Sequence, residues 1–302
     1  MDDFVQYLAE LRNKLSEVAA VSAEKDIAYG HQFTMLKGDE KVTLTVYNGK
    51  KGRKLVWGGS SGSLSAALQA AVNGEQVDAQ DPLQQKQFSG IWAGSDESGK
   101  GDFFGPLVVA AVVVDNATAI KLGAAGVKDC KLLTDKKILE LETAIKEIAL
   151  SYSVLELKPE IYNLRYEQVR KEGGNLNRLL GYGHIAALSK VLQEQPACSG
   201  ALIDQFTTSD AIIKVLTAKF SAVEFRQQPR AESNIAVAAA SILARAQFLH
   251  RMDVLSEQAG FTLPKGGGTA ATEAAQQLAD QQGKDALRGY VKLHFANYAK
   301  LK

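Results

Sequence analysis

Cysteine is scarce in this chain, and its two copies form neither a disulfide framework nor a metal-ligand pattern. Among 302 residues only Cys130 and Cys198 occur, far apart and without a paired spacing. Such usage excludes a disulfide scaffold and is typical of a reducing compartment. Long apolar runs are also missing, and the acidic start Met1-Asp2-Asp3-Phe4 lacks the basic lead of a signal peptide. We therefore expect a cytoplasmic, monomeric protein with no membrane partner.

An excess of charge of one sign is absent as well, since 35 basic residues and 34 acidic residues leave a net charge of +1. Global charge therefore neither favours nor excludes a polyanionic partner, and local clusters carry more information. The segment 37–54 has a local charge of +4, from six basic and two acidic residues: Lys37, Lys41, Lys50, Lys51, Arg53 and Lys54 against Asp39 and Glu40. A second basic stretch begins at Lys284.

The length of the chain predicts two domains, because 302 residues exceed the usual size of one core. Helical spacing opens residues 1–72, and alternating runs and a second helical stretch follow, which predicts a small α+β domain. The strands expected there are 32–36, 41–47 and 54–57. Residues 73–89, rich in Gln, Asp and Gly, are predicted to be a linker.

Residues 90–302 are predicted to form the larger domain, an α/β fold with a mixed sheet flanked by helices. The expected strands lie near 91–96, 107–115, 151–158, 201–206 and 222–227. The expected helices lie near 134–149 and 175–194 and in the Ala-rich stretch 234–245. His184 falls in one of these helices, where a lone histidine is more often a packing residue, so we assign it no catalytic role.

One face of the strand predicted at 41–47 is polar. The two-residue period places Lys41, Thr43, Thr45 and Tyr47 on the same side of that strand. Such a face suits nucleic-acid docking, but a solvated outer sheet face fits these residues equally well.

Asp96 and Glu97 form an adjacent acidic pair between two apolar runs, 91–93 and 107–114. Glycines at 94, 99, 101 and 105 allow a sharp turn and a close approach of a phosphate group. A phosphate-binding P-loop fits the spacing of Gly94, Gly99 and Lys100, but Gly101 replaces the required hydroxyl and the acids would repel phosphate. The alternatives that stay open are a solvated turn and a site for a divalent metal.

Two further acids lie where strands and helices are expected to end or begin. Asp204 closes the short apolar run 201–203, although a cap or turn residue would look the same. Glu232 precedes the Ala-rich helix, where the helix dipole alone favours an acid. If all four carboxylates converge, their mutual repulsion requires bound cations.

Four sequence blocks occur in an order known from one protein family. They are GSDESGKGDFFGPLVVAAVVVD from Gly94, VKDCKLL at 127–133, ALIDQF at 201–206 and RAESNIAVAAASILAR at 230–245. The chain resembles bacterial ribonuclease HIII from residue 88 to its end. The N-terminal part is more loosely similar to that family's extra substrate-binding domain, which resembles the TATA-binding-protein fold.

Two details distinguish the sister family, ribonuclease HII, which usually reads Gly-Arg-Gly after its first acids and has Asp as its fourth acid. Here Gly99-Lys100-Gly101 and Glu232 favour HIII. One departure is Cys130, since the family's common Asp-Ser-Lys is here Asp129-Cys130-Lys131.

The resemblance implies a ribonuclease H-like core that cuts the RNA strand of RNA–DNA hybrids. Divalent metal, Mg²⁺ or Mn²⁺, would be held by Asp96, Glu97, Asp204 and Glu232, with Asp96 and Asp204 as direct ligands. Two such ions about 4 Å apart would act on the scissile phosphate and leave 5′-phosphate and 3′-hydroxyl ends.

Further residues are expected to bind the substrate. Recognition of the 2′-hydroxyl falls to Gly99, Lys100 and Gly101, and Lys131 would contact phosphate. The N-terminal domain would add affinity through Lys41, Tyr47 and Lys50. Two alternatives remain open: HII-like cleavage at single ribonucleotides in duplex DNA, and a module that binds hybrids without cutting them.

Overall fold

The computed structural model divides the chain into two compact units, Met1–Asp81 and Pro82–Lys302. The division falls inside the segment 73–89, where the sequence predicts a linker. Residues 74–87 and 89 of that segment lie outside the described residues, so the linker itself stays a prediction. The structure describes residues 3–37, 40–49, 52–59, 63–73, 88 and 90–302.

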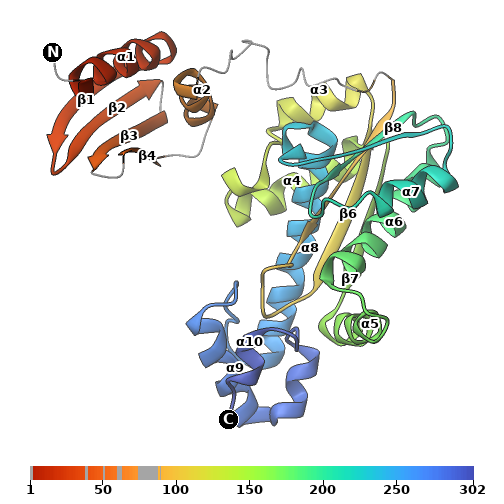
Figure 1. Cartoon of the computed structure of the whole chain (residues 1–302). Coiled ribbons are helices and arrows are strands. Elements are labelled where there is room, and N and C mark those ends of the chain that lie inside the picture. The colour runs from red at the N-terminus through yellow and green to blue at the C-terminus, as the bar shows by residue number, and fades with distance from the viewer. Residues whose placement is uncertain (1–2, 38–39, 50–51, 60–62, 74–87, 89) are drawn as a thin grey trace. The chain divides into compact units, whose positions relative to one another are not determined.

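The first unit is a four-stranded antiparallel sheet with two helices packed on it, in agreement with the expected α+β domain (Figure 1). The strands follow the order of the sequence, β1-β2-β3-β4. Its elements are α1 (Asp3–Val18), β1 (Ala20–Ile27), β2 (Gly30–Lys37), β3 (Glu40–Gly49), β4 (Gly52–Gly59) and α2 (Ser63–Asn73). The three predicted strands are confirmed within β2, β3 and β4, whereas β1 was not predicted.

Among the described residues of the first unit, one face of this sheet packs in the core. Val42, Leu44 and Val46 of β3 are fully buried in a cluster to which Leu15 of α1 and Leu68 of α2 also belong. The intervening residues point the other way, as the period of a strand requires. The predicted polar face of Lys41, Thr43, Thr45 and Tyr47 therefore lies opposite the helices.

The second unit contains a five-stranded mixed sheet in the order β7-β6-β5-β8-β9. Strands β5 (Trp92–Ser98), β6 (Leu107–Val114) and β7 (Ser151–Leu157) pair antiparallel, while β8 (Gly200–Asp204) and β9 (Glu224–Gln228) continue parallel to β5. This is the predicted mixed sheet, with helices packed on its faces (Figure 1).

Helices cover both faces of this sheet, which explains why β6 is apolar throughout. On one face lie α3 (Asn116–Ala125), α4 (Asp135–Ile148) and the long α8 (Ile235–Ala259), in a cluster with Val108, Ala110 and Val112. On the other lie α6 (Leu176–Glu194) and α7 (Ala211–Lys219), packed with Val109 and Ala111. A strand buried on both sides needs apolar residues at every position.

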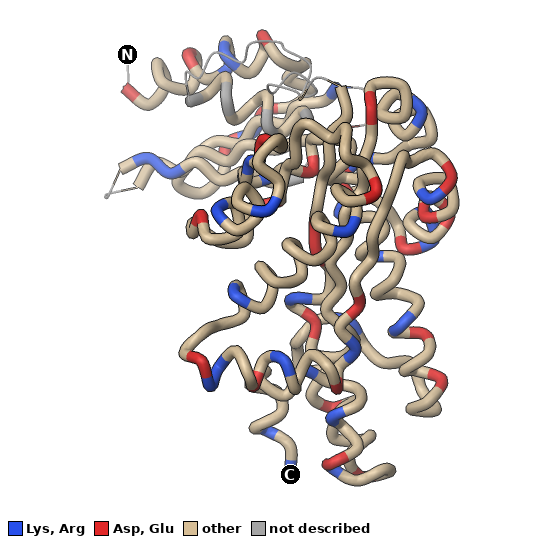
Figure 2. The backbone as a smooth tube through the Cα atoms, turned by 90° about the vertical axis from the view of Figure 1, so that its right-hand side faces the viewer, with Lys and Arg blue, Asp and Glu red and all other residues tan. Residues whose placement is uncertain are grey.

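The remaining elements in the described part of the second unit are α5 (Pro159–Lys171), α9 (Thr269–Gln282), α10 (Ala296–Ala299) and the short 3₁₀ turns η2 (Cys130–Leu132), η3 (Ala231–Ser233) and η4 (Lys284–Gly289). Acidic and basic residues are interspersed along the chain, with neither kind confined to one element (Figure 2). Among the described residues, no helix combines the length and apolar character needed to cross a membrane.

Candidate active site

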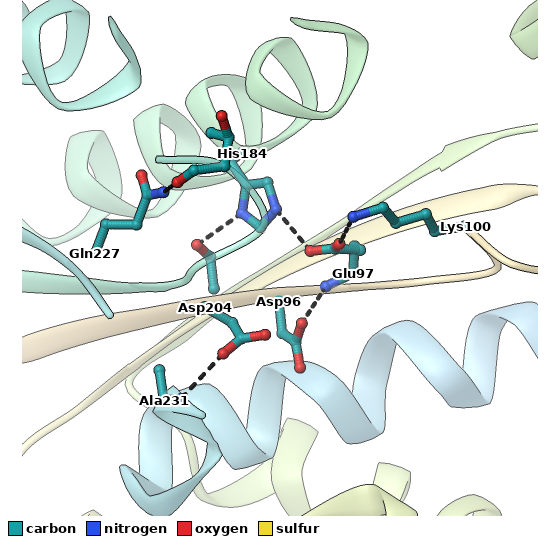
Figure 3. Close-up of polar contacts among 9 residues, drawn as sticks. Asp96, Glu97, Lys100, His184, Asp204, Gln227 and Ala231 are labelled. Carbon is teal, nitrogen blue, oxygen red and sulfur yellow. Dashed lines mark hydrogen bonds and ion pairs between the residues drawn. The ribbon is translucent and has the colours of Figure 1, made fainter. Parts of the chain in front are cut away.

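Asp96 and Asp204 come together because β5 and β8 are neighbouring parallel strands. The last paired residues are Ser95 and Ile203, and the two aspartates follow one position later. On β8, Leu202 packs in the cluster that contains α8, and by strand alternation Asp204 faces the same side. Figure 3 shows the two carboxylates turned toward each other, on the side of the sheet that α8 covers. From the sequence alone, the convergence of the acids was taken as a condition. For Asp96 and Asp204, the pairing of β5 with β8 explains it.

Glu232 approaches from η3, the turn that precedes α8. This turn is tied to the strand end, because the Ala231 backbone N–H donates to Asp204 Oδ1 at 3.0 Å. Asn234 then caps α8 by accepting from the Ala236 N–H at 3.0 Å, and the same oxygen accepts from Trp92 Nε1 at 3.2 Å. The start of α8 is thus fixed to both β5 and β8, and the charge of Glu232 acts on Asp96.

Gly94 permits this close approach of α8 to β5. A Cβ at Gly94 would lie 2.3 Å from the Val237 backbone nitrogen and 2.4 Å from the Ala236 carbonyl carbon. No side chain fits there without moving the helix. The first glycine of the acidic segment therefore serves helix packing, whereas from the sequence it was assigned to a sharp turn and to the close approach of a phosphate group.

Glu97 points to the opposite side of β5 from Asp96, as strand alternation dictates. Its Oε2 lies 3.1 Å from His184 Nε2, and its Oε1 lies 3.6 Å from Lys100 Nζ (Figure 3). The adjacent acidic pair thus spreads over two faces at the end of the strand.

The pKa values of these acids follow their surroundings. Burial, together with the charges of Glu97, Asp204 and Glu232, raises the pKa of Asp96 well above its usual range. Burial also raises the pKa of Asp204, and the charges of Glu232 and Glu97 add to this rise, while the hydrogen bond from the Ala231 N–H opposes it. For Glu97, burial alone would raise the pKa, but His184 and Lys100 lower it on balance. Asp96 and Asp204 therefore share negative charge that the protein leaves poorly compensated.

Lys131, which was expected to contact phosphate, lies beside Glu232. Lys131, in η2, contacts Glu232 Oε1 through Nζ at 3.0 Å while its side chain stays 72% exposed. Although burial lowers the pKa of Lys131, Glu232 raises it on balance. Cys130 is half-buried, and burial raises the pKa of its thiol. Lys131 thus neutralises one of the four acids and remains open to a ligand.

The predicted recognition residues Gly99, Lys100 and Gly101 form the turn after β5. Gly99 has a φ of +85°, and a Cβ there would lie 2.2 Å from the Pro106 carbonyl oxygen, so glycine is required. Gly101 is exposed, with open space where a Cβ would project. Its role toward a substrate stays a prediction.

A buried lysine from the C-terminal part of the chain supports the rest of this loop. Lys292 Nζ donates to the carbonyl oxygens of Asp102 and Gly105, both at 2.8 Å. The Lys292 backbone N–H donates to Phe103 O at 2.9 Å, and the Gly105 N–H donates to Tyr290 O at 2.9 Å. Burial lowers the pKa of Lys292 to about 7.

The binding residues predicted in the first unit are described only in part. Lys41 and Tyr47 are exposed on β3, and Tyr47 retains 40% of its surface. Lys50 lies outside the described residues, so its prediction is not tested.

Among the described residues, no three His, Cys, Asp or Glu side chains form a ready metal cluster. The donor chemistry nevertheless fits a hard divalent cation, because Asp96 and Asp204 offer carboxylate oxygens that face each other. The pKa of both aspartates is raised because burial and neighbouring acids disfavour their negative charge, and a bound cation would neutralise that charge.

His184 is the site residue to which sequence reasoning gave no role. It is fully buried on α6 and touches both Glu97 and Ser95. One signal was available, because glycines at 181 and 183 precede it in a helix, where glycine is unfavourable. Gly183 marks a close packing site, since its Cβ would lie 2.7 Å from Val109 Cγ2.

Comparison with known proteins finds a family model that matches most of the second unit and a solved structure that matches almost the whole chain. The family model described as ribonuclease HII matches residues 93–298. The ribonuclease HIII of Protochlamydia amoebophila (strain UWE25) is 40% identical over 202 residues, which are 67% of this chain and 65% of that protein. The ribonuclease HIII of Chlamydia pneumoniae is 40% identical over 68% of each chain. The crystal structure of Bst-RNase HIII in complex with Mn²⁺ has a TM-score of 0.65 at 32% identity, covering 98% of this chain and 94% of the other.

Proposed function

The chain belongs to the ribonuclease HIII branch of the ribonuclease HII family, a family of ribonucleases, and from that membership we propose that it hydrolyses the RNA strand of RNA–DNA hybrids. The observation that carries the proposal is the meeting of Asp96 and Asp204 at adjacent strand ends. The alignment spans about two thirds of each of these relatives, so the activity rests on the site as well as on the similarity.

We propose that Asp96 and Asp204 hold Mg²⁺ or Mn²⁺ directly, and that Glu97 and Glu232 complete the site. The chemistry that two bound divalent ions supply in such a site is stabilisation of the attacking and leaving oxygens of a phosphate displacement. The Ala231 N–H orients Asp204, and His184 with Lys100 orients Glu97. The expected products carry 5′-phosphate and 3′-hydroxyl ends.

The proposal assigns substrate contacts to residues beside the acids. Lys131 is exposed next to Glu232 and suits a phosphate contact, while the open turn of Gly99-Lys100-Gly101 suits the sugar edge of the RNA strand. In the first unit, the face of Lys41 and Tyr47 combines a charge with an aromatic ring, which suits a nucleic-acid backbone and its bases. This unit would add affinity by tethering rather than chemistry.

A labelled RNA–DNA hybrid tests the proposal. We expect cleavage with Mg²⁺ or Mn²⁺ and none with a chelator. Asp96→Asn should lower the rate by at least a hundredfold, because it removes the charge that attracts the cation, while binding of the hybrid in chelator stays unchanged. Asp253→Asn is the matched control, since Asp253 is exposed on α8. Wild-type cleavage by Asp96→Asn would refute the site.

The match to the ribonuclease HII family model favours testing a second substrate. A DNA duplex with one embedded ribonucleotide discriminates the HII-like activity, because only that activity requires cleavage at a single ribonucleotide. Faster cleavage of this duplex than of the hybrid would replace our proposal by the HII-like one. Membership in a family of ribonucleases argues against the third possibility, a module that never cuts.

A further inference from the structure

His184 links two residues of β5 from inside the protein. Its Nδ1 lies 2.9 Å from Ser95 Oγ, and its Nε2 lies 3.1 Å from Glu97 Oε2 (Figure 3). Ser95 and Glu97 are two positions apart and share the α6 face of the strand. Both ring nitrogens of one fully buried histidine are thus engaged by a single strand end.

The chemistry of the partners fixes the proton on this ring. An ionised carboxylate only accepts hydrogen bonds, so Nε2 carries the hydrogen that it donates to Glu97. In the neutral ring Nδ1 is then an acceptor, and the Ser95 hydroxyl donates to it. Ser95, itself fully buried, selects the tautomer that Glu97 needs.

Packing holds the ring in one orientation. It stacks on Phe206 with ring centroids 4.9 Å apart and an interplanar angle of 18°. The preceding residue, Gly183, brings α6 against Val109 of β6. The ring therefore has little freedom to turn away from Glu97.

We infer that His184 is a positioning residue that anchors Oε2 of Glu97 and leaves Oε1 as the oxygen that changes partner when substrate and cation bind. Strand alternation directs Glu97 away from Asp96, so an anchor on the α6 side is what fixes its carboxylate at the strand end. In the structure Oε1 is 3.6 Å from Lys100 Nζ, on a side chain that is 37% exposed and can be displaced. This inference rests on the proposed function.

Two amide variants separate positioning from mere packing. In His184→Gln the amide nitrogen reaches the place of Nε2 and can still donate to Glu97. In His184→Asn the shorter side chain reaches only the place of Nδ1, beside Ser95. Both are polar and uncharged and differ by one methylene group. The measurements are kcat and KM on a labelled hybrid, Mn²⁺ affinity by electron paramagnetic resonance of free Mn²⁺, and hybrid binding in chelator.

We expect His184→Asn to lose about 10- to 100-fold in kcat and to weaken Mn²⁺ binding, as removal of an outer partner of a metal ligand commonly does. Hybrid binding in chelator should stay within twofold of the wild type, and His184→Gln should recover most of both losses. Equal behaviour of the two variants, or wild-type kcat and Mn²⁺ affinity in His184→Asn, would overturn the inference.

If His184→Asn fails to fold, Ser95→Ala decides the matter. It leaves Nε2 beside Glu97 but removes the hydroxyl that fixes the tautomer, so kcat should fall several-fold at unchanged KM. Wild-type kcat in that variant overturns the inference. An inactive wild-type protein would instead refute the proposed function.

Discussion

Asp96 destabilises the folded protein as long as no cation neutralises it. It is half-buried, and the carboxylates of Glu97, Asp204 and Glu232 act on it together with the cost of burial. Among these acids, Glu97 has a histidine and Glu232 has a lysine within ion-pair distance. Asp204 accepts a hydrogen bond from the Ala231 backbone N–H. The two aspartates proposed as direct metal ligands are thus acids with a raised pKa, so their ionised forms lower the stability of the metal-free protein.

Asp96→Asn should therefore raise the thermal unfolding midpoint of the metal-free protein near pH 7. Stability from a raised carboxyl pKa is fully present below the unfolded value of about 3.9 and is lost as pH rises through the folded pKa. The gain of the variant over the wild type should accordingly grow from pH 4 toward pH 8. Scanning calorimetry in chelator at several pH values measures it, with Asp253→Asn as control. A gain that is constant with pH would contradict the assignment.

At the scale of elements, the site depends on the contact between α8 and β5. The start of α8 is fastened by Asn234 to Trp92, and η3 is fastened by Ala231 to Asp204. Gly94 of β5 packs directly against the backbone of Val237 at the start of α8. Any shift of α8 therefore moves Glu232 relative to the two aspartates.

Gly94→Ala should damage activity more than its small size suggests. The added carbon would lie 2.3 Å from a backbone nitrogen, so the helix must move. We expect a loss of about 1–3 kcal/mol in the free energy of unfolding, as for overpacked cores. The value of kcat should fall at least tenfold with little change in KM. Denaturant unfolding and hybrid cleavage measure these effects.

Gly123→Ala provides the contrast, because Gly123 lies in α3 with open space around it. There an added methyl group favours the helix by up to about 1 kcal/mol. Equal effects of the two substitutions would show that Gly94 is not a packing requirement.

Elements with a strong pattern could be predicted from the sequence, and elements without one could not. The apolar run of β6 and the Ala-rich α8 show their burial directly in their composition. Strand β1, with the sequence AVSAEKDI, is almost wholly exposed and lacks alternation, so it is defined by its pairing with β2. The four acids could be named in advance. The opposite facing of Asp96 and Glu97 follows from strand alternation alone. The contact of Glu97 with His184 could not be predicted, because it depends on packing between β5 and α6.

At the scale of the whole molecule, distant parts of the chain complete one site. The acids come from β5, β8 and η3, and the loop after β5 is held by Lys292, almost two hundred residues further along. Because Lys292 donates to backbone carbonyls, it fixes the path of the loop independently of the side chains of the loop. The second unit thus contains all the proposed catalytic residues, and the role proposed for the first unit is substrate binding.

The polar face of the first unit should therefore affect KM and not kcat. In the full-length protein, Lys41→Ala combined with Tyr47→Ala removes a charge and a ring from β3. One stacking contact contributes about 1–3 kcal/mol, which predicts at least a fivefold rise in KM for a long hybrid. The salt dependence of binding should also become weaker, since one phosphate contact is lost. Steady-state cleavage and filter binding at several salt concentrations measure both effects.

Tyr152→Ala is the matched control for the ring, because Tyr152 is 37% exposed on β7, the edge strand of the sheet in the second unit, and is not part of this face. Its KM should stay within twofold of the wild type. If the double variant lowers kcat at unchanged KM, the first unit acts on the chemistry and the tether proposal is wrong. If KM and kcat both keep their wild-type values, this face does not bind the hybrid, and the loop beside the acids must supply the affinity by itself.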